Sequence, residues 1–298
     1  MNMLVEKFLK YMRYELNHSV HTVLSYTTDL RQFLDFLKVS EEAFSPSLVT
    51  PSDIRSWVYE MSSNKLAVAT IRRKLQSVRM FYRWMQRESL TDVNPTDDIP
   101  VPKSPSRLPV FIREKSMDQV LDAEYNVNDF ESVRNHLILE MLYETGMRRA
   151  ELIGLKDINI DVKAGEMKVL GKRNKERIIP FGVNLAEQIS AYRKIRREVG
   201  PEVDNFFITE KGKPLYPSLI YKVVTIALSQ VTNSKRSPHV LRHTFASAML
   251  NNGAELNSVK ELLGHESLAA TQIYTHITYR ELKQNYKHAH PRALKKGG

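Results

Sequence analysis

Residues 237–250, SPHVLRHTFASAML, decide how the second half of this chain is interpreted. A serine that can cap a helix precedes apolar residues at helical spacing, so the stretch predicts a capped amphipathic helix. Its first turn carries His239, Arg242 and His243. His239 and Arg242 are three residues apart, share one face and can converge on a small anion. We expect His243 to be a hydrogen-bonded histidine of the core.

The same two histidines have the i, i+4 spacing of a zinc-binding pair. The metalloprotease pattern needs Glu after the first histidine, where this chain has Val240. The guanidinium of Arg242, between the two imidazoles, would also repel a divalent cation. We therefore expect a site that uses neither a metal nor another cofactor.

The composition indicates a basic protein of two ordinary-sized domains. The chain has 298 residues and a formal net charge of +10, from 44 Lys and Arg against 34 Asp and Glu. That excess favours a polyanionic partner, nucleic acid first, although many basic proteins bind none. The absence of cysteine excludes disulfides, thiolate metal sites and cysteine nucleophiles. With no spanning apolar run and no signal-peptide pattern, the expected location is the cytoplasm, away from membranes.

A proline-rich connector divides the chain. Residues 94–109, NPTDDIPVPKSPSRLP, hold five of the 13 prolines, which block both helix and central strand. We therefore predict an N-terminal domain at 1–94, a linker at 95–109 and a C-terminal domain at 110–298.

The N-terminal domain is predicted to be entirely helical. The expected helices cover about residues 3–16, 20–38, 51–62 and 70–87, the third opened by a capping box of Thr50 and Asp53. The fourth holds six basic residues and no acidic one. A helical wheel places four of them on one narrow stripe, where we expect contacts with DNA phosphates: Arg72, Arg79, Arg83 and Arg87.

The second domain is predicted to be mainly α with one small antiparallel β-sheet. A buried helix over 132–144 ends at Gly146, and a short helix follows it. Residues 166–181 alternate like a β-hairpin whose tip is basic, with Arg173 and Lys175 as further expected DNA contacts. Helices are expected near 184–198, 217–230, 239–251, 256–263 and 267–276.

Three other segments complete a pattern with the opening stretch. ETGMRRAELIGL places Arg148 just after a helix-terminating glycine, Lys172 lies at the hairpin tip, and LLGHESLAATQIYTH holds His265 and Tyr274. The order Arg, Lys, His-x-x-Arg, His, Tyr resembles that of the tyrosine recombinases, or phage integrases, and the size and arrangement resemble their Xer branch. The resemblance covers nearly the whole chain and implies a helical SAM-like core-binding domain followed by a tyrosine-recombinase catalytic domain.

The resemblance implies a role for each residue. Arg148 and Arg242 would bind the nonbridging oxygens of the scissile phosphate, for which the forked guanidinium group is suited. Tyr274 would attack phosphorus and leave a 3′-phosphotyrosine with a free 5′-hydroxyl. Lys172 would protonate the leaving oxygen.

His239 and His265 would bind the phosphate and assist proton movement.

Several neighbours remain as alternatives. Tyr279 is a rival nucleophile, and Lys175 is a substitute acid. Arg149 stands where the family commonly has an aliphatic residue. Glu151 either orients an arginine or completes a surface ion pair.

The favoured function is Xer-type resolution of chromosome or plasmid dimers, linked to chromosome partition and cell division. A mobile-element integrase, a type IB topoisomerase and a catalytically silent DNA-binding protein are the alternatives. The implied partners are double-stranded DNA with a specific site, either further copies of this chain in a homo-tetramer or a second recombinase paralogue in a hetero-tetramer, and a DNA translocase as activator. The C-terminal tail would dock on a neighbouring protomer or fold on its own domain.

Overall fold

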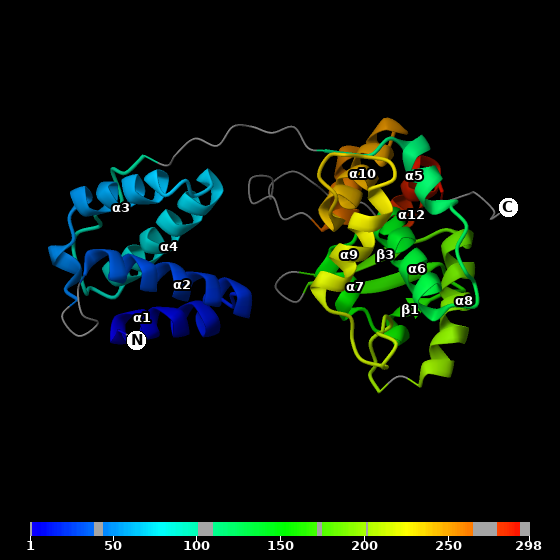
Figure 1. Cartoon of the computed structure of the whole chain (residues 1–298), viewed down its shortest axis with the longest axis horizontal. Coiled ribbons are helices and arrows are strands. Elements are labelled where there is room, and N and C mark those ends of the chain that lie inside the picture. The colour runs from blue at the N-terminus through cyan, green and yellow to red at the C-terminus, as the bar shows by residue number, and fades with distance from the viewer. Residues whose placement is uncertain are drawn as a thin grey trace. The chain divides into compact units, whose positions relative to one another are not determined.

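The computed structural model describes residues 2–38, 44–100, 110–171, 175–200, 202–264 and 279–292, excepting the side chains of 279–282. The chain divides into two compact units, Met1–Arg107 and Leu108–Gly298 (Figure 1). In the described part of the chain, no helix is both long enough and apolar enough to cross a bilayer.

The first unit is helical, as predicted. Its elements are α1 (Met3–Lys10), which continues as a π-helical turn over Tyr11–Glu15, and then α2 (Val20–Leu37), α3 (Pro51–Ser63) and α4 (Val68–Arg87). Ser19 caps α2, and Thr50 with Asp53 forms the predicted capping box of α3. The helices enclose one aromatic-rich core in which Phe8, Phe81 and Trp84 contact one another.

The beginning of the predicted connector packs on this first unit. Thr96 and Ile99 are buried, and the Arg79 guanidinium on α4 donates hydrogen bonds to their carbonyl oxygens at 3.0 and 3.2 Å. The remainder of the connector, residues 101–109, lies outside the described residues.

The second unit packs helices around a small sheet, as expected. The helices are α5 (Glu114–Leu121), α6 (Phe130–Thr145), α7 (Arg149–Gly154), α8 (Val183–Val199), α9 (Pro217–Leu228), α10 (Pro238–Asn251), α11 (Leu256–Leu263) and α12 (Tyr279–Ala289). The buried helix α6 packs against α8, α9 and α10. Two elements were not predicted from the sequence, α5 and the short strand β1.

The sheet is antiparallel in the order β1 (Ile160–Asp161), β2 (Glu166–Leu170) and β3 (Glu176–Pro180). In the predicted hairpin, Glu166 lies opposite Pro180 and Leu170 opposite Glu176. The hairpin tip, residues 172–174, falls outside the described part.

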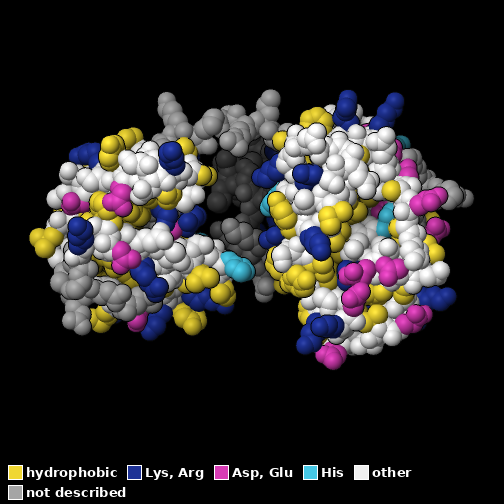
Figure 2. Space-filling model, in the orientation of Figure 1, with side chains coloured by type: hydrophobic (Ala, Val, Ile, Leu, Met, Phe, Trp, Pro, Cys, Tyr) yellow, Lys and Arg dark blue, Asp and Glu magenta, His cyan; other side chains and the backbone are white. Residues whose placement is uncertain are grey.

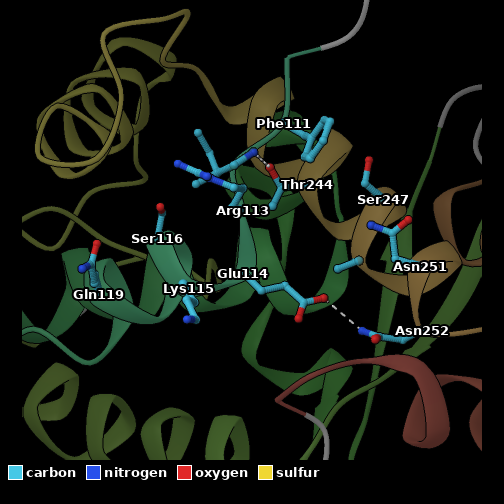
Figure 3. Close-up of a pocket in the computed structure, with 12 residues that line it drawn as sticks. Phe111, Arg113, Glu114, Lys115, Ser116, Gln119, Thr244, Ser247, Asn251 and Asn252 are labelled. Atoms are coloured by element: carbon cyan, nitrogen blue, oxygen red, sulfur yellow. Dashed lines mark hydrogen bonds between the residues drawn. The ribbon is translucent and has the colours of Figure 1, made fainter.

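Helix α10 is fixed in its middle and at its C-terminal end. Thr244 Oγ1 accepts a hydrogen bond from the Ile112 amide at 3.0 Å, and Asn252 bonds Glu114 at 3.0 Å (Figure 3). These contacts border a cavity of about 700 Å³ between residues 111–119 and α10. None of the predicted site residues that the structure describes lines this cavity, which lies where residues 111–119 contact α10.

The C-terminal segment packs on its own unit, against α10 and α11. Tyr286 and Ala289 of α12 are buried in the same apolar cluster as Phe245. Beyond the helix, His290 is buried against the Phe245 and Tyr286 rings. Of the two arrangements considered for the tail, the structure therefore contains the one within a single chain.

A buried ion cluster completes this attachment. The Arg292 guanidinium lies 3.0 Å from Glu140 Oε1 and 2.8 Å from Asp122 Oδ1. Burial and the neighbouring Glu140 raise the pKa of Glu144, while His136, Glu144 and Arg292 offset burial and lower the pKa of Glu140. Of these two α6 carboxyls, Glu144 is therefore the more readily protonated, and the Arg292 guanidinium pairs with Glu140.

Replacing Arg292 should destabilise the second unit. Arg292→Met leaves a buried carboxylate without its cation, a change that costs about 3–5 kcal/mol. Urea unfolding followed by circular dichroism measures the loss, with Arg197→Met, an exposed arginine on α8, as the control. Equal unfolding midpoints for Arg292→Met and the wild type would contradict an attachment through this cluster.

Acid should weaken the attachment through His290. Burial lowers the pKa of His290 to about 3, whereas an unfolded histidine titrates near 6.5. Between these values the unfolded state binds a proton that the folded state does not, so stability falls as the pH falls, by up to about 1.4 kcal/mol per pH unit. His290→Phe should show a shallower fall between pH 6.5 and 4.5 in urea titrations. His288→Phe, exposed on the same helix, is the control, and an unchanged slope in His290→Phe would contradict the assignment.

Candidate active site

Two guanidinium groups are anchored to the ends of helices in the second unit. The Arg242 side chain is buried and donates to the carbonyl oxygens of Gly146 at 2.7 Å and Leu263 at 2.6 Å. Arg148 donates to the carbonyl oxygen of Gly264 at 2.9 Å. These acceptors lie where α6 and α11 end, and helix C-termini attract cations. These hydrogen bonds to neighbouring helix ends therefore bring Arg148 and Arg242 together, as predicted.

Gly146 lets these groups come close. It ends α6 in the left-handed region at φ 57°, which residues with side chains rarely adopt. A Cβ at this position would lie 2.4 Å from Cδ1 of Phe245 on α10. Only glycine allows α6 to end against the helix that carries Arg242.

Glu151 connects Arg148 to the sheet. Its buried carboxylate accepts from the Arg148 amide at 2.7 Å and from the Arg148 guanidinium at 2.8 Å. Arg177 of β3 donates to both oxygens of the same carboxylate at 2.8 Å and to the Leu262 carbonyl oxygen at 2.8 Å. Burial would raise the pKa of Glu151, but the bonds and charges of Arg177 and Arg148 lower it. Of the two readings of Glu151, the geometry fits orientation of an arginine.

A cavity of about 90 Å³ opens between these elements. Arg148, Arg242 and His239 line it together with Met147, Arg149, Tyr221, Ser237 and Pro238, and no acidic side chain of the described residues lines it. Burial, followed by the like charge of Arg148, lowers the pKa of Arg242 to about 10. The cavity is therefore electropositive, and a bound anion would relieve the cost of holding the two cations together.

The two histidines of α10 behave differently from each other. His239 lines the cavity, and partial desolvation with the nearby His243 and Arg242 lowers its pKa below 6.5. The imidazole of His239 is therefore mostly neutral at pH 7, able to donate through one nitrogen and accept through the other. His243 is exposed, so the expectation of a core histidine is wrong. The first turn of α10 lies at the surface on that side.

Four predicted site residues lie outside the described part of the chain: Lys172, Arg173, His265 and Tyr274. Lys175 is described and exposed, and its carbonyl oxygen accepts from the Gly171 amide at 2.7 Å across the hairpin. The chain leaves the described region at Gly264, beside Arg148, and returns at Tyr279.

The predicted basic stripe of α4 separates into two pairs. Arg72 and Arg83 are exposed, and no described residue bonds to their guanidinium groups. Arg79 is bonded to the Thr96 and Ile99 carbonyl oxygens, and Arg87 donates to Glu88 at 2.7 Å and to the Tyr11 hydroxyl at 2.6 Å. Figure 2 shows Lys and Arg side chains spread over the visible face of this unit with Asp and Glu among them.

Sequence reasoning missed three residues at the site. Arg177 supports Glu151 from a strand 26 residues further along the chain, and Tyr221 lines the cavity from α9 while 46% exposed. Ser237 was considered only as a helix cap, yet its side chain makes no capping hydrogen bond. The signal for Arg177 is its strand position, because alternation places it on the same face as the buried Ile179.

The whole chain resembles known recombinases. Residues 110–281 match the Phage integrase family, and residues 5–89 match the phage integrase N-terminal SAM-like domain. Tyrosine recombinase XerC of Halalkalibacterium halodurans is 38% identical over 299 residues, which is 97% of each chain. Tyrosine recombinase XerD of the same organism is 35% identical and covers 97% of this chain and 98% of its own.

A solved structure has the same fold. The crystal structure of XerH site-specific recombinase bound to a palindromic difH substrate, a post-cleavage complex, aligns with a TM-score of 0.71 at 22% identity, over 95% of this chain and 83% of that one. With family matches in both units and relatives at 35–38% identity over nearly the full length, the chain belongs to the phage integrase family and is a tyrosine recombinase, an enzyme that cleaves and rejoins DNA.

Proposed function

We propose that the cavity between α7 and α10 holds the scissile DNA phosphate. The observation that carries this proposal is the pair of anchored guanidinium groups beside a space that no acidic side chain in the described part of the chain lines. Arg148 and Arg242 each keep N–H groups beyond those bonded to the protein, because a guanidinium has five. Those donors neutralise the nonbridging oxygens, whose charge grows as phosphorus becomes five-coordinate.

Tyr274 is the proposed nucleophile. Its phenol oxygen forms a bond to phosphorus, and the bond from phosphorus to the 5′-oxygen breaks, leaving a 3′-phosphotyrosine. The phenol proton passes to a base for which His239 is suited, since its imidazole is mostly neutral. Lys172 donates a proton to the departing 5′-oxygen, and His265 bonds the phosphate. Attack by a 5′-hydroxyl of another duplex reverses the same step and exchanges strands.

Chain length supports the placement of Tyr274 near the cavity. It follows Gly264, whose carbonyl oxygen bonds Arg148, by ten residues and precedes Tyr279, where α12 begins, by five. A chain spans at most about 3.5 Å per residue, so five residues reach no more than about 17 Å from α12. Since α12 packs on α10, this reach supports a Tyr274 phenol close to the helix that carries Arg242.

The proposed biological role is Xer-type resolution of chromosome or plasmid dimers in the cytoplasm. The similarity to relatives named XerC and XerD over almost the whole chain supports it. By the same reasoning, the partners are a specific DNA duplex, contacted in part by Arg72 and Arg83, and a second recombinase paralogue in a tetramer. A DNA translocase is the proposed activator.

Replacing the proposed nucleophile should abolish covalent attachment to DNA. Tyr274→Phe removes only the attacking oxygen, so the variant should still bind duplex DNA but form no adduct. Suicide substrates that carry a nick near the cleavage point trap the adduct, which is read on denaturing gels. Tyr279→Phe is the matched control and should retain the adduct. The reverse pattern would move the nucleophile to residue 279.

Removing the charge of Glu151 should slow cleavage through Arg148. Glu151→Gln keeps the shape but leaves Arg148 and Arg177 without their shared anion, and we expect the single-turnover rate at saturating DNA to fall about tenfold to a hundredfold. The dissociation constant for the duplex, measured by fluorescence anisotropy, should change by only about twofold or threefold. Glu187→Gln, exposed on α8, is the control. If the role of Glu151 is purely structural, Glu151→Gln will instead lower the melting temperature and leave the cleavage rate of the folded fraction unchanged.

A further inference from the structure

Ser237 carries a buried hydroxyl that has no partner within the described ranges of the chain. The residue is 4% exposed, and its Oγ bonds to no described residue. A buried polar atom left unpaired costs on the order of 1–3 kcal/mol, so such atoms are rare in folded proteins. The hydroxyl is available to a ligand that the free protein lacks.

Ser237 is the N-cap of α10, yet it does not cap the helix. Its side chain makes no bond to the first-turn amides. Pro238 has no N–H, and the Val240 amide donates to the Ser237 carbonyl oxygen at 2.9 Å. The amide of His239 is left with no acceptor among the described residues. The start of this 14-residue helix therefore presents an unused amide beside the unused hydroxyl.

The same residue lines the cationic cavity. Ser237 borders the space of about 90 Å³ together with Arg148, Arg242 and His239. A helix N-terminus attracts anions through its unpaired amides and its dipole. Two guanidinium groups, a helix start and an unpaired hydroxyl thus surround one small space, and all of them are donors suited to a single anion.

We propose that Ser237 is a further phosphate ligand of this recombinase. Its hydroxyl turns about the Cα–Cβ bond and donates a hydrogen bond to a nonbridging oxygen of the DNA phosphate held by Arg148 and Arg242. This rests on the proposed function, because it requires the cavity to be the phosphate site. A neutral donor aimed at that oxygen contributes most when phosphorus is five-coordinate, so Ser237 acts on the rate of cleavage more than on duplex affinity.

The test compares cleavage and stability in one set of variants. Ser237→Ala should slow adduct formation on the nicked suicide substrate about tenfold or more at saturating DNA. Because the Ser237 hydroxyl bonds to none of the described residues, the melting temperature of this variant should stay the same or rise. Ser237→Thr keeps the hydroxyl and should restore the rate to within a few-fold of wild type.

Thr244→Val is the matched control on the same helix. Thr244 is also buried, but its hydroxyl accepts from the Ile112 amide at 3.0 Å and donates to the Val240 carbonyl oxygen at 2.8 Å. Its loss should lower the melting temperature and leave the cleavage rate of the folded enzyme within about twofold. A fall in melting temperature for Ser237→Ala as large as that of Thr244→Val would overturn the proposal in favour of a capping role.

A second measurement separates this proposal from the function on which it rests. Inorganic phosphate should raise the melting temperature of the wild type, and the rise should be smaller in Ser237→Ala but unchanged relative to each baseline in Thr244→Val. If the wild type forms the adduct and Ser237→Ala forms it at the same rate, the ligand role of Ser237 is overturned and the proposed function stands. If the wild type forms no adduct but its melting temperature rises with phosphate, and Ser237→Ala loses that rise, the proposed function is overturned and the role of Ser237 as a phosphate ligand stands. Equal phosphate responses in both proteins would overturn the ligand in either case.

Discussion

Two like charges must be held side by side before any substrate arrives, and the rest of the second unit is arranged around that constraint. Arg148 and Arg242 repel each other, and burial strengthens the repulsion. Carbonyl oxygens at the ends of α6 and α11 offset it with partial negative charge, and Glu151 supplies a full one. The guanidinium groups are thereby fixed in advance, which reduces the reorganisation needed when charge develops on a bound phosphate.

The parts of the unit that lie far from the cavity also serve this arrangement. Arg177 joins the hairpin to Glu151 and to the end of α11, so the strand that follows the hairpin tip is tied to the arginine pair. Helix α12 and the buried Arg292 cluster fix the chain just after the segment that contains Tyr274. The proposed acid thus belongs to a hairpin that Arg177 attaches to Glu151, and the segment of the proposed nucleophile follows Gly264, whose carbonyl oxygen bonds Arg148.

The sequence predicts elements well where several local signals coincide. The caps of α2 and α3, the glycine end of α6 and the alternation of β2 and β3 all lie within a few residues of what they specify. Strand β1, with two residues, is too short to carry a period, and helix α5 lacks both a capping side chain and the glycine end that marks α11. The uses of Arg79 and Arg87 depend on partners 17 to 76 residues away, which a helical wheel does not contain. Tertiary packing likewise decides that His243 is exposed and that Arg177 and Arg148 both bond to Glu151.

The anchors of the two arginines are main-chain atoms, and this has an evolutionary consequence. Every residue has a carbonyl oxygen, so exchange of the Leu263 side chain for another apolar group preserves the acceptor for Arg242. Insertion or deletion of one residue near the end of α11 would instead rotate that oxygen by about 100° around the helix axis. Drift in this part of the protein should therefore be permissive toward side-chain identity and strict toward segment length.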